Sequence, residues 1–152
     1  QAIATVHAAL SQNVDESVDF DEVARTIVRM AGAIASTDHA VEVITTGSFG
    51  TIQADQAQAL ATVLNELVAN SVEHGLADRD GLIEVRAERE GASMTVTVAD
   101  DGVGFVPGTP MSGLGTQIVH QMVRGELKGS IEWAPREGGG TLVTLRANLD
   151  PA

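Results

Sequence analysis

Apolar residues recur at helical spacing in four stretches of the chain, and each stretch predicts an amphipathic helix. They are residues 1–10, 19–34, 55–75 and 114–127. The second helix is expected to begin at Asp19, because Glu22 follows three residues later in the spacing of a capping box. The third is expected to end at Gly75, since glycine commonly terminates a helix.

Alternation of apolar and polar residues predicts strands in the remaining segments. The strands are expected at residues 41–45, 51–53, 83–88, 94–99, 131–133 and 143–149. The sequence GSFG at residues 47–50 predicts a hairpin turn between the first two strands, and glycines 138–140 favour a hairpin turn over a phosphate-binding loop. Trp133 is expected to pack in the core. Helices and strands interleave but short hairpins join the last strands, which predicts an α+β fold with a mixed sheet and helices on one face.

Composition narrows the classes of function. The chain has 152 residues, enough for one domain, and no cysteine, which excludes disulfides and favours a cytosolic setting. Its formal net charge is −12 without any run of Lys or Arg, which argues against contact with nucleic acid or an anionic membrane. No apolar stretch is long enough to span a bilayer, and the four histidines are too scattered for a structural zinc site.

A row of polar residues interrupts the third predicted helix. Glu66, Asn70 and His74 follow one another at i, i+4 and i+8, which places a carboxylate, an amide and an imidazole along one face. Asn is a poor helix former, because its side chain competes for backbone hydrogen bonds. The row indicates either a binding site or a solvated face of an amphipathic helix.

The segment DDGVGF at residues 100–105 places a carboxylate where a core residue is expected. Asp100 shares its strand parity with Met94, Val96 and Val98, and a buried ionised Asp needs a donor. The donor is either part of a ligand or the backbone of a turn that Asp100 caps. Further on, two prolines bar a return strand, so Gly102 and Gly104 are expected where the backbone approaches a ligand.

The segment Gly113–Leu114–Gly115–Thr116 runs directly into the last predicted helix. Free amides at a helix start, with no bulky side chains in the way, form an anion site suited to phosphates. Taken alone the segment is weak evidence, since any helix can begin after glycine.

The segments NELVANSVEHG, DDGVGF and SGLGTQIV occur in this order from Asn65 onwards, and together they resemble the nucleotide-binding boxes of the GHKL ATPase superfamily. The spacing of Glu66 and Asn70 and the wording NELVAN are similar to the catalytic domain of sensor histidine kinases of the HisKA_2/HWE-like type. The resemblance covers about residues 19–149. It implies the two-layer α/β sandwich of the Bergerat (GHKL-type) fold, with ATP and Mg²⁺ as ligands.

The resemblance also implies roles for single residues. Asn70 matches the Mg²⁺ ligand and Asp100 the residue that accepts the adenine amino group, while Thr141 matches a threonine near that aspartate, where a water can mediate contact. Glu66 matches the position that activates water in related ATPases, and in a kinase it orients or polarises the attacking group.

The remaining residues of the boxes are expected around the phosphates or the base. His74 is expected at the phosphates or on the surface, and Asn65 frames the site or makes other polar contacts. The other expected nucleotide-binding positions are Gly102, Gly104, Gly113, Leu114, Gly115 and Thr116. Residues 106–112 would form a lid that is short for this family.

The function implied is that of the catalytic, ATP-binding domain of a two-component sensor histidine kinase. Residues 1–18 would be the end of a dimerisation-hairpin helix and a linker, and residues 19–152 the catalytic domain. The γ-phosphoryl of ATP would pass to a histidine outside this chain, since the family's acceptor lies on the preceding helix and His7 is therefore not expected to accept it. The implied partners are the dimerisation and phosphoacceptor helices of a parent kinase and a response-regulator receiver domain, in the cytoplasm.

Two alternatives remain open at this stage. One is a serine kinase of the anti-sigma-factor type from the same superfamily. The other is a non-catalytic nucleotide sensor, in which occupancy by ATP only biases a partner interface.

Overall fold

The computed structural model describes residues 17–35, 40–76, 79–103 and 114–150. The helices are α2 (Phe20–Ala35), α3 (Ala54–Asn70), its π-helical continuation η2 (Ser71–Gly75) and α4 (Leu114–Gly125). The strands are β1 (Ser17–Asp19), β2 (Val41–Gly47), β3 (Thr51–Gln53), β4 (Gly81–Glu90), β5 (Ser93–Asp100), β6 (Ser130–Pro135) and β7 (Thr141–Asn148). The helical segment expected at residues 1–10, together with His7, lies outside the described residues.

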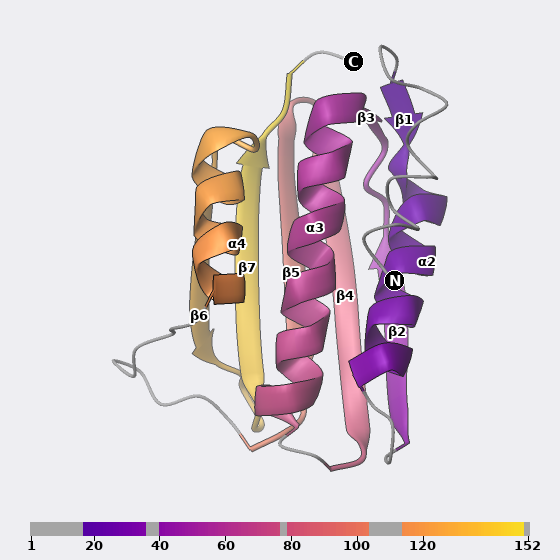
Figure 1. Ribbon diagram of the computed structural model, residues 1–152, viewed down its shortest axis with the longest axis vertical. Helices are drawn as coiled ribbons and strands as arrows, with labels where there is room; N and C mark the ends of the chain where they lie inside the picture. Colours follow the sequence, from indigo (N-terminus) through magenta and orange to yellow (C-terminus); the bar gives the residue numbers. More distant parts are fainter. Residues whose placement is uncertain (1–16, 36–39, 77–78, 104–113, 151–152) are drawn as a thin grey trace.

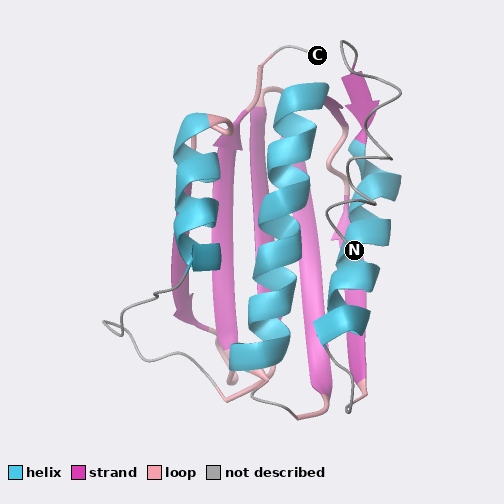
Figure 2. Cartoon of the chain, viewed as in Figure 1, coloured by secondary structure: helices cyan, strands magenta, loops and turns pink. Residues whose placement is uncertain are grey.

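A five-stranded sheet in the order β2-β4-β5-β7-β6 forms one layer of the molecule. β2 pairs with β4 in parallel, and the other neighbours pair antiparallel, so the sheet is mixed as the sequence predicts. The helices α2, α3 and α4 all lie on one face of this sheet (Figures 1 and 2). The predicted two-layer α/β sandwich is therefore confirmed.

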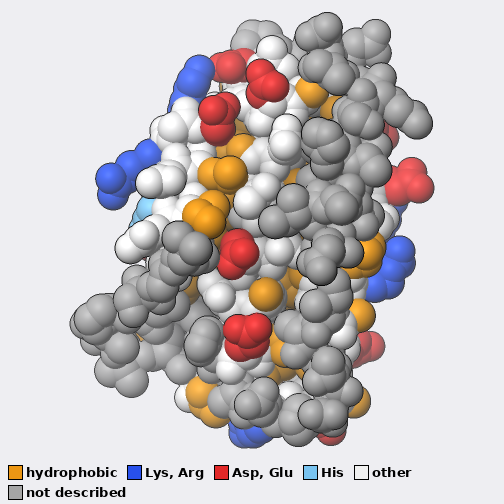
Figure 3. All heavy atoms as spheres, in the orientation of Figure 1, with side chains coloured by type: hydrophobic (Ala, Val, Ile, Leu, Met, Phe, Trp, Pro, Cys, Tyr) orange, Lys and Arg blue, Asp and Glu red, His pale blue; other side chains and the backbone are white. Residues whose placement is uncertain are grey.

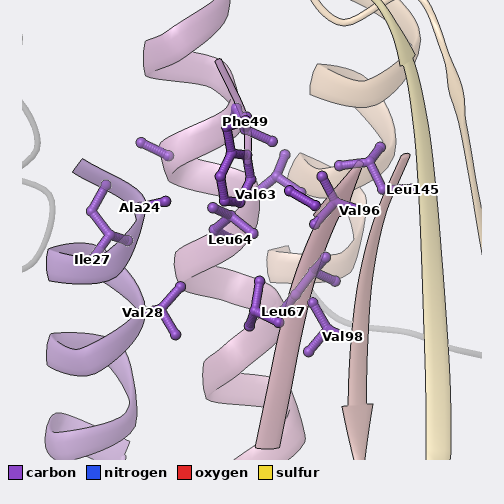
Figure 4. Packing of buried hydrophobic residues seen from close by; sticks show 14 of the residues in the cluster. Ala24, Ile27, Val28, Phe49, Val63, Leu64, Leu67, Val96, Val98 and Leu145 are labelled. Atoms are coloured by element: carbon purple, nitrogen blue, oxygen red, sulfur yellow. The ribbon is translucent and has the colours of Figure 1, made fainter. Parts of the chain in front are cut away.

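The core lies between α3 and the inner face of the sheet. Leu60, Leu64 and Leu67 of α3 are at most 1% exposed, because α2 and α4 flank this helix while the sheet covers its inner face. In Figure 4 the side chains of α3 lie between those of α2 and the inward-facing Val96 and Val98 of β5. The outward-facing residues of the same strands are mainly polar, so strand alternation decides which residues face the helices.

The helix α2 begins where the sequence predicts. Its first residue is Phe20, and the carboxylate of Asp19 accepts the main-chain N–H of Asp21 at 3.3 Å. This contact satisfies one of the amides that every helix start leaves without a partner inside the helix. Among the described helices, none is long and apolar enough to cross a membrane.

The hairpin predicted at residues 47–50 is wrong. β2 pairs with β4, whereas β3 pairs with β1 in a separate two-stranded sheet. The connecting segment folds over the start of α2, where the Asp21 carboxylate accepts hydrogen bonds from the Ser48 hydroxyl (2.9 Å) and the Phe49 N–H (2.5 Å). The Phe49 ring packs 5.3 Å from that of Phe20, between centroids. These contacts outweigh the local turn signal of the two glycines.

The long central helix changes geometry near its end. α3 is regular up to Asn70, and then the N–H of Leu76 donates to the carbonyl of Ser71, five residues earlier, at 2.7 Å. This π turn keeps both Val72 and Leu76 in the core, at 4% and 0% exposure. The helix extends to Gly75 as predicted. The i, i+4 spacing expected for Glu66, Asn70 and His74 holds only up to Asn70, because the π turn begins at Ser71.

Candidate functional site

Several elements that carry the predicted site residues meet at one end of the molecule. β5 ends and β7 begins there, with Asp100 and Thr141 as direct partners in the antiparallel ladder. The π turn that follows α3 contacts β5 at the same end. The helix α4 runs antiparallel to α3, so the start of α4 is directed toward this end of the molecule (Figure 1). Asn70, Asp100 and Thr141 therefore come from elements that meet at this end, and Thr116 lies on a helix whose start is directed toward it.

Asp100 is the most unusual residue of this end. It is 2% exposed, which confirms that strand parity turns it toward the core. Its Oδ1 accepts hydrogen bonds from the N–H of Gly102 (3.0 Å) and the N–H of Thr141 (3.3 Å). Among the described residues, no donor reaches its Oδ2. Asp100 thus caps a turn, one of the alternatives from the sequence, through one of its two oxygens.

The electrostatics of Asp100 follow from its burial. Desolvation raises the pKa of its carboxyl above the ordinary value of 3.8, and the two amide donors counteract this effect by stabilising the charged form. The negative charge of Asp101 raises the same pKa further, and the guanidinium of Arg136 lowers it. The net shift is upward, so the ionised carboxylate gains from any further donor.

The turn before β7 is fitted closely to Asp100. Residues 136–140 form the hairpin turn between β6 and β7 that the sequence predicts, with hydrogen bonds from Arg136 N–H to Gly140 O (2.9 Å) and from Gly139 N–H to Arg136 O (3.0 Å). Gly140 has φ of 102°, and a Cβ at this position would overlap the main-chain oxygen of Asp100. Only glycine fits there without displacing the strand end that carries Asp100.

Asn65, Glu66 and Asn70 lie on the outer part of α3 and are half-buried. Glu66 and Asn70 keep their i, i+4 relation, because both belong to the regular part of the helix. The Asn70 side chain makes no capping hydrogen bond to the turn that follows, so its amide oxygen remains available to a ligand. The backbone of His74 lies in the π turn, but its side chain is outside the described part of the chain.

The start of α4 is partly described. The helix begins at Leu114, and Thr116 is buried at 6% exposure. Its first turn contains no acidic residue, so no carboxylate of this turn competes for the amides at the helix start. The side chain of Leu114 lies outside the described residues, as do Gly104 and Gly113, and of Gly115 only the backbone is described.

Charge around the site is predominantly negative. α3 contributes Asp55 and Glu66 and no Lys or Arg. Figure 3 shows carboxylates near the middle of the helix-covered face, whereas Lys and Arg side chains lie toward its edges. Among the described residues, no group of three or more His, Cys, Asp or Glu side chains could hold a metal ion by itself. An anionic ligand at this end would need its own counter-cation.

Trp133 packs against the core from β6 and is half-buried, in agreement with the expected packing role. Its ring lies 5.4 Å from that of His120 on α4, between centroids. Two other residues of this end, Asp101 and Arg136, were not singled out from the sequence. Asp101 bonds to Leu82 and the charge of Arg136 acts on Asp100, and both interactions join segments far apart in the chain.

The sequence pattern of the family described as histidine kinase-, DNA gyrase B- and HSP90-like ATPase matches residues 55–151. The chain belongs to this family. The match contains all of the predicted site residues, from Asn65 to Thr141. This places the buried carboxylate and the polar end of α3 within a GHKL-type ATPase domain, as the resemblance of the three segments implies.

Relatives of this ATPase domain include the sensor histidine kinase PdtaS of Mycobacterium tuberculosis (strain H37Rv), which is 39% identical over 150 residues. The PdtaS protein of Mycolicibacterium smegmatis is 39% identical over 153 residues. The alignments cover 95% and 97% of this chain but only 30% and 31% of the relatives. The chain thus spans about a third of the length of the curated relatives it matches.

Solved structures agree on the fold. The histidine kinase domain from the Erythrobacter litoralis EL346 blue-light activated histidine kinase superposes with a TM-score of 0.80 at 20% identity, covering 97% of this chain and 78% of that one. The mycobacterial sensor histidine kinase MprB superposes with a TM-score of 0.65 at 22% identity, covering 91% of this chain and all of the other. At these identities the likeness extends to the ATPase fold alone.

Proposed function

We propose that this ATPase domain is the catalytic part of a sensor histidine kinase, which binds ATP with Mg²⁺ and transfers the γ-phosphoryl group to a histidine on another segment. The observation that carries the proposal is the buried Asp100, whose Oδ1 is held by two amides while no donor of the described residues reaches Oδ2. The relatives named sensor histidine kinase PdtaS support the choice of reaction.

Adenine fits the open oxygen because its exocyclic amino group is a donor and an ionised carboxylate is only an acceptor. A base with a carbonyl at that position would present an acceptor to an acceptor. Thr141 is 9% exposed and is the ladder partner of Asp100, and its hydroxyl is proposed to assist through a water molecule. Gly102 donates its amide to Asp100 and keeps the approach to the base free of side chains.

The phosphates are proposed to lie between the end of α3 and the start of α4. Asn70 offers an amide oxygen, a ligand type that Mg²⁺ accepts while retaining several waters and phosphate oxygens. Bound Mg²⁺ would supply the positive charge that α3 lacks. The amides from Gly113 to Thr116, with Leu114 and Gly115 between them, would bind phosphate oxygens. Asn65 and His74 are proposed to complete this part, and Gly104 to lie beside it.

Transfer of the phosphoryl group depends mainly on positioning and on stabilising charge in the transition state. Glu66, one helical turn before Asn70, is proposed to orient or polarise the attacking histidine nitrogen. Residues 1–18 are proposed to end a dimerisation hairpin, and a response-regulator receiver domain is the proposed next acceptor. The HisKA_2/HWE-like subtype and a cytoplasmic setting belong to the same proposal.

Calorimetric titration with ATP, with and without Mg²⁺, tests the binding step. Asn70→Ala should remove the part of the affinity that depends on Mg²⁺. Gln58→Ala is the matched control, because this exposed amide lies on the same helix about three turns away and should leave binding unchanged. Absence of ATP binding by the unaltered chain in the presence of Mg²⁺ would refute the proposal.

The transfer step needs the full-length parent protein. Incubated with ATP labelled at the γ-phosphate, it should acquire label that acid releases, since phosphohistidine is acid-labile. An acid-stable product would indicate phosphoserine and contradict the histidine kinase assignment. ATP binding without any labelling would instead favour a nucleotide sensor.

A further inference from the structure

Asp101, the second carboxylate of the segment DDGVGF, ends the ladder between β4 and β5 in an unusual way. Its main-chain N–H donates to the carbonyl of Leu82 at 3.3 Å, as expected for a hydrogen-bonded antiparallel pair. The reciprocal bond, however, runs from the Leu82 N–H to the side-chain Oδ1 of Asp101 at 2.9 Å. The carboxylate therefore occupies the place of the Asp101 carbonyl, and the main chain is released from the sheet toward Gly102.

This bond lies where three elements meet. Gly81, the first residue of β4, is so enclosed that a Cβ would overlap the Leu76 side chain and lie 2.8 Å from the Asp101 Oδ1. Leu76 is fully buried, and its N–H donates the last hydrogen bond of the π turn that continues α3 to the carbonyl of Ser71. The end of α3, the start of β4 and the end of β5 are thus packed around one glycine, with the Asp101 carboxylate as their polar contact.

From this arrangement we infer that Asp101 is a positioning residue for nucleotide binding. Its carboxylate fixes the point at which the chain leaves β5, directly after Asp100 and directly before Gly102, relative to the end of the helix that carries Asn70. The base-binding side and the metal-binding side of the proposed site are thereby held at a set separation. The inference rests on the proposed function, since it concerns how ATP is bound.

The contact requires an acceptor atom and not a negative charge. The donor is a neutral main-chain amide, and Asp101 itself is exposed to solvent. A negative charge beside Asp100 opposes the binding of an anionic nucleotide by repulsion. Asn at this position would keep the acceptor and remove the charge, whereas Ala would remove both.

The two substitutions therefore separate positioning from charge. We expect Asp101→Ala to weaken ATP binding about tenfold, or about 1.4 kcal/mol, and to accelerate amide hydrogen exchange at Leu82. We expect Asp101→Asn to bind ATP at least as tightly as the unaltered chain. Calorimetry with ATP and Mg²⁺ gives the affinities, and thermal unfolding monitored by circular dichroism verifies that each variant is folded.

Asp80→Ala is the matched control, because it also removes a hydrogen bond from a main-chain N–H to an aspartate side chain at the start of β4. The Asp80 Oδ1 accepts the N–H of Ala40 at 2.8 Å, a bond of the same kind that joins β4 to β2 instead of β5. This variant should lose stability comparably and keep its affinity for ATP. Equal weakening in Asp80→Ala and Asp101→Ala would reduce the effect to general destabilisation and overturn the inference.

Two other results would also overturn it. Unchanged ATP affinity in Asp101→Ala would show that the tie does not position the site, and equal losses in the Asn and Ala variants would show that the charge matters instead. Failure of the unaltered chain to bind ATP would refute the proposed function itself, and the inference that rests on it. If the unaltered chain binds ATP, each of the earlier results would overturn only the inference about Asp101 and would leave the proposed function unaffected.

Discussion

Replacing Asp100 by Asn should weaken ATP binding and raise the free energy of unfolding. The ionised carboxylate favours ATP binding, but its burial destabilises the ligand-free fold. The amides of Gly102 and Thr141 both donate to Oδ1, so an Asn side chain must place its carbonyl oxygen there. Its NH₂ group then occupies the position of Oδ2. A donor would face the donor of the adenine amino group, and the variant should lose its preference for ATP.

The expected loss of affinity follows from the bond removed. A hydrogen bond to a charged acceptor contributes about 1.5–3 kcal/mol, so its loss should raise the dissociation constant about 10- to 150-fold. Inosine triphosphate carries a carbonyl in place of the amino group, so it should bind the Asn variant relatively better. The ratio of the two affinities should therefore fall, even if overall binding also weakens.

The stability of the ligand-free domain should move the other way. Burial raises the folded-state pKa of Asp100 above 3.8, so at neutral pH the folded protein carries a charge that costs more there than in the unfolded chain. Asn removes this cost, and each unit by which the pKa is raised corresponds to about 1.4 kcal/mol of unfolding free energy. The advantage of the variant should narrow as pH falls through the folded-state pKa, where the native carboxyl becomes protonated.

Calorimetry with ATP and with inosine triphosphate, combined with urea unfolding at pH 7, measures both effects on the same samples. Unchanged affinity for ATP in the Asn variant would refute the assignment of Oδ2 to the base. A marked decrease in unfolding free energy at pH 7 would refute the statement that the ionised carboxylate is costly in the folded protein.

Three further expectations can be measured in the same way. Gly138→Ala, with φ of 90° but nothing within 4 Å, should lower the unfolding free energy by the backbone cost alone, about 1–3 kcal/mol. Gly140→Ala should lower it further and weaken ATP binding, because its Cβ would also overlap the main-chain oxygen of Asp100. ATP affinity should fall as pH drops toward the folded-state pKa of Asp100, since a protonated carboxyl is a poorer acceptor, and titrations of Asp100→Asn should lack this component. Gln56→Ala should lower the unfolding free energy by about 1–3 kcal/mol and leave ATP binding unchanged, because the buried Gln56 bonds to Glu126 O and Asp150 N–H at the far end of α3.

Much of the fold could be predicted because its signals are local and periodic. The apolar faces of α2, α3 and α4 and the alternation in β4, β5 and β7 correspond to the helices and strands of the structure. Strand parity alone predicts that Asp100 faces the core. The same argument could not show that Asp100 and Thr141 are ladder partners, because strand pairing depends on contacts between segments far apart in the chain.

The features that the sequence did not predict depend on contacts between distant segments. The turn expected at residues 47–50 was overridden by Asp21 and Phe20, which lie on another element. Asp101 carries no local signal, because its side-chain bond joins it across the ladder to Leu82. The π turn after Asn70 has no local signal in the residue types, because it results from the need to bury Leu76.

The bond from Thr141 N–H to Asp100 spans 41 positions of sequence, yet it joins the two ends of a detour that leaves the sheet and returns to it. The same carboxylate accepts the N–H of Gly102 at one end of this detour and the N–H of Thr141 at the other, so one side chain holds both ends in register. Lengthening or replacing the segment at 104–113 would leave the anchor points in register.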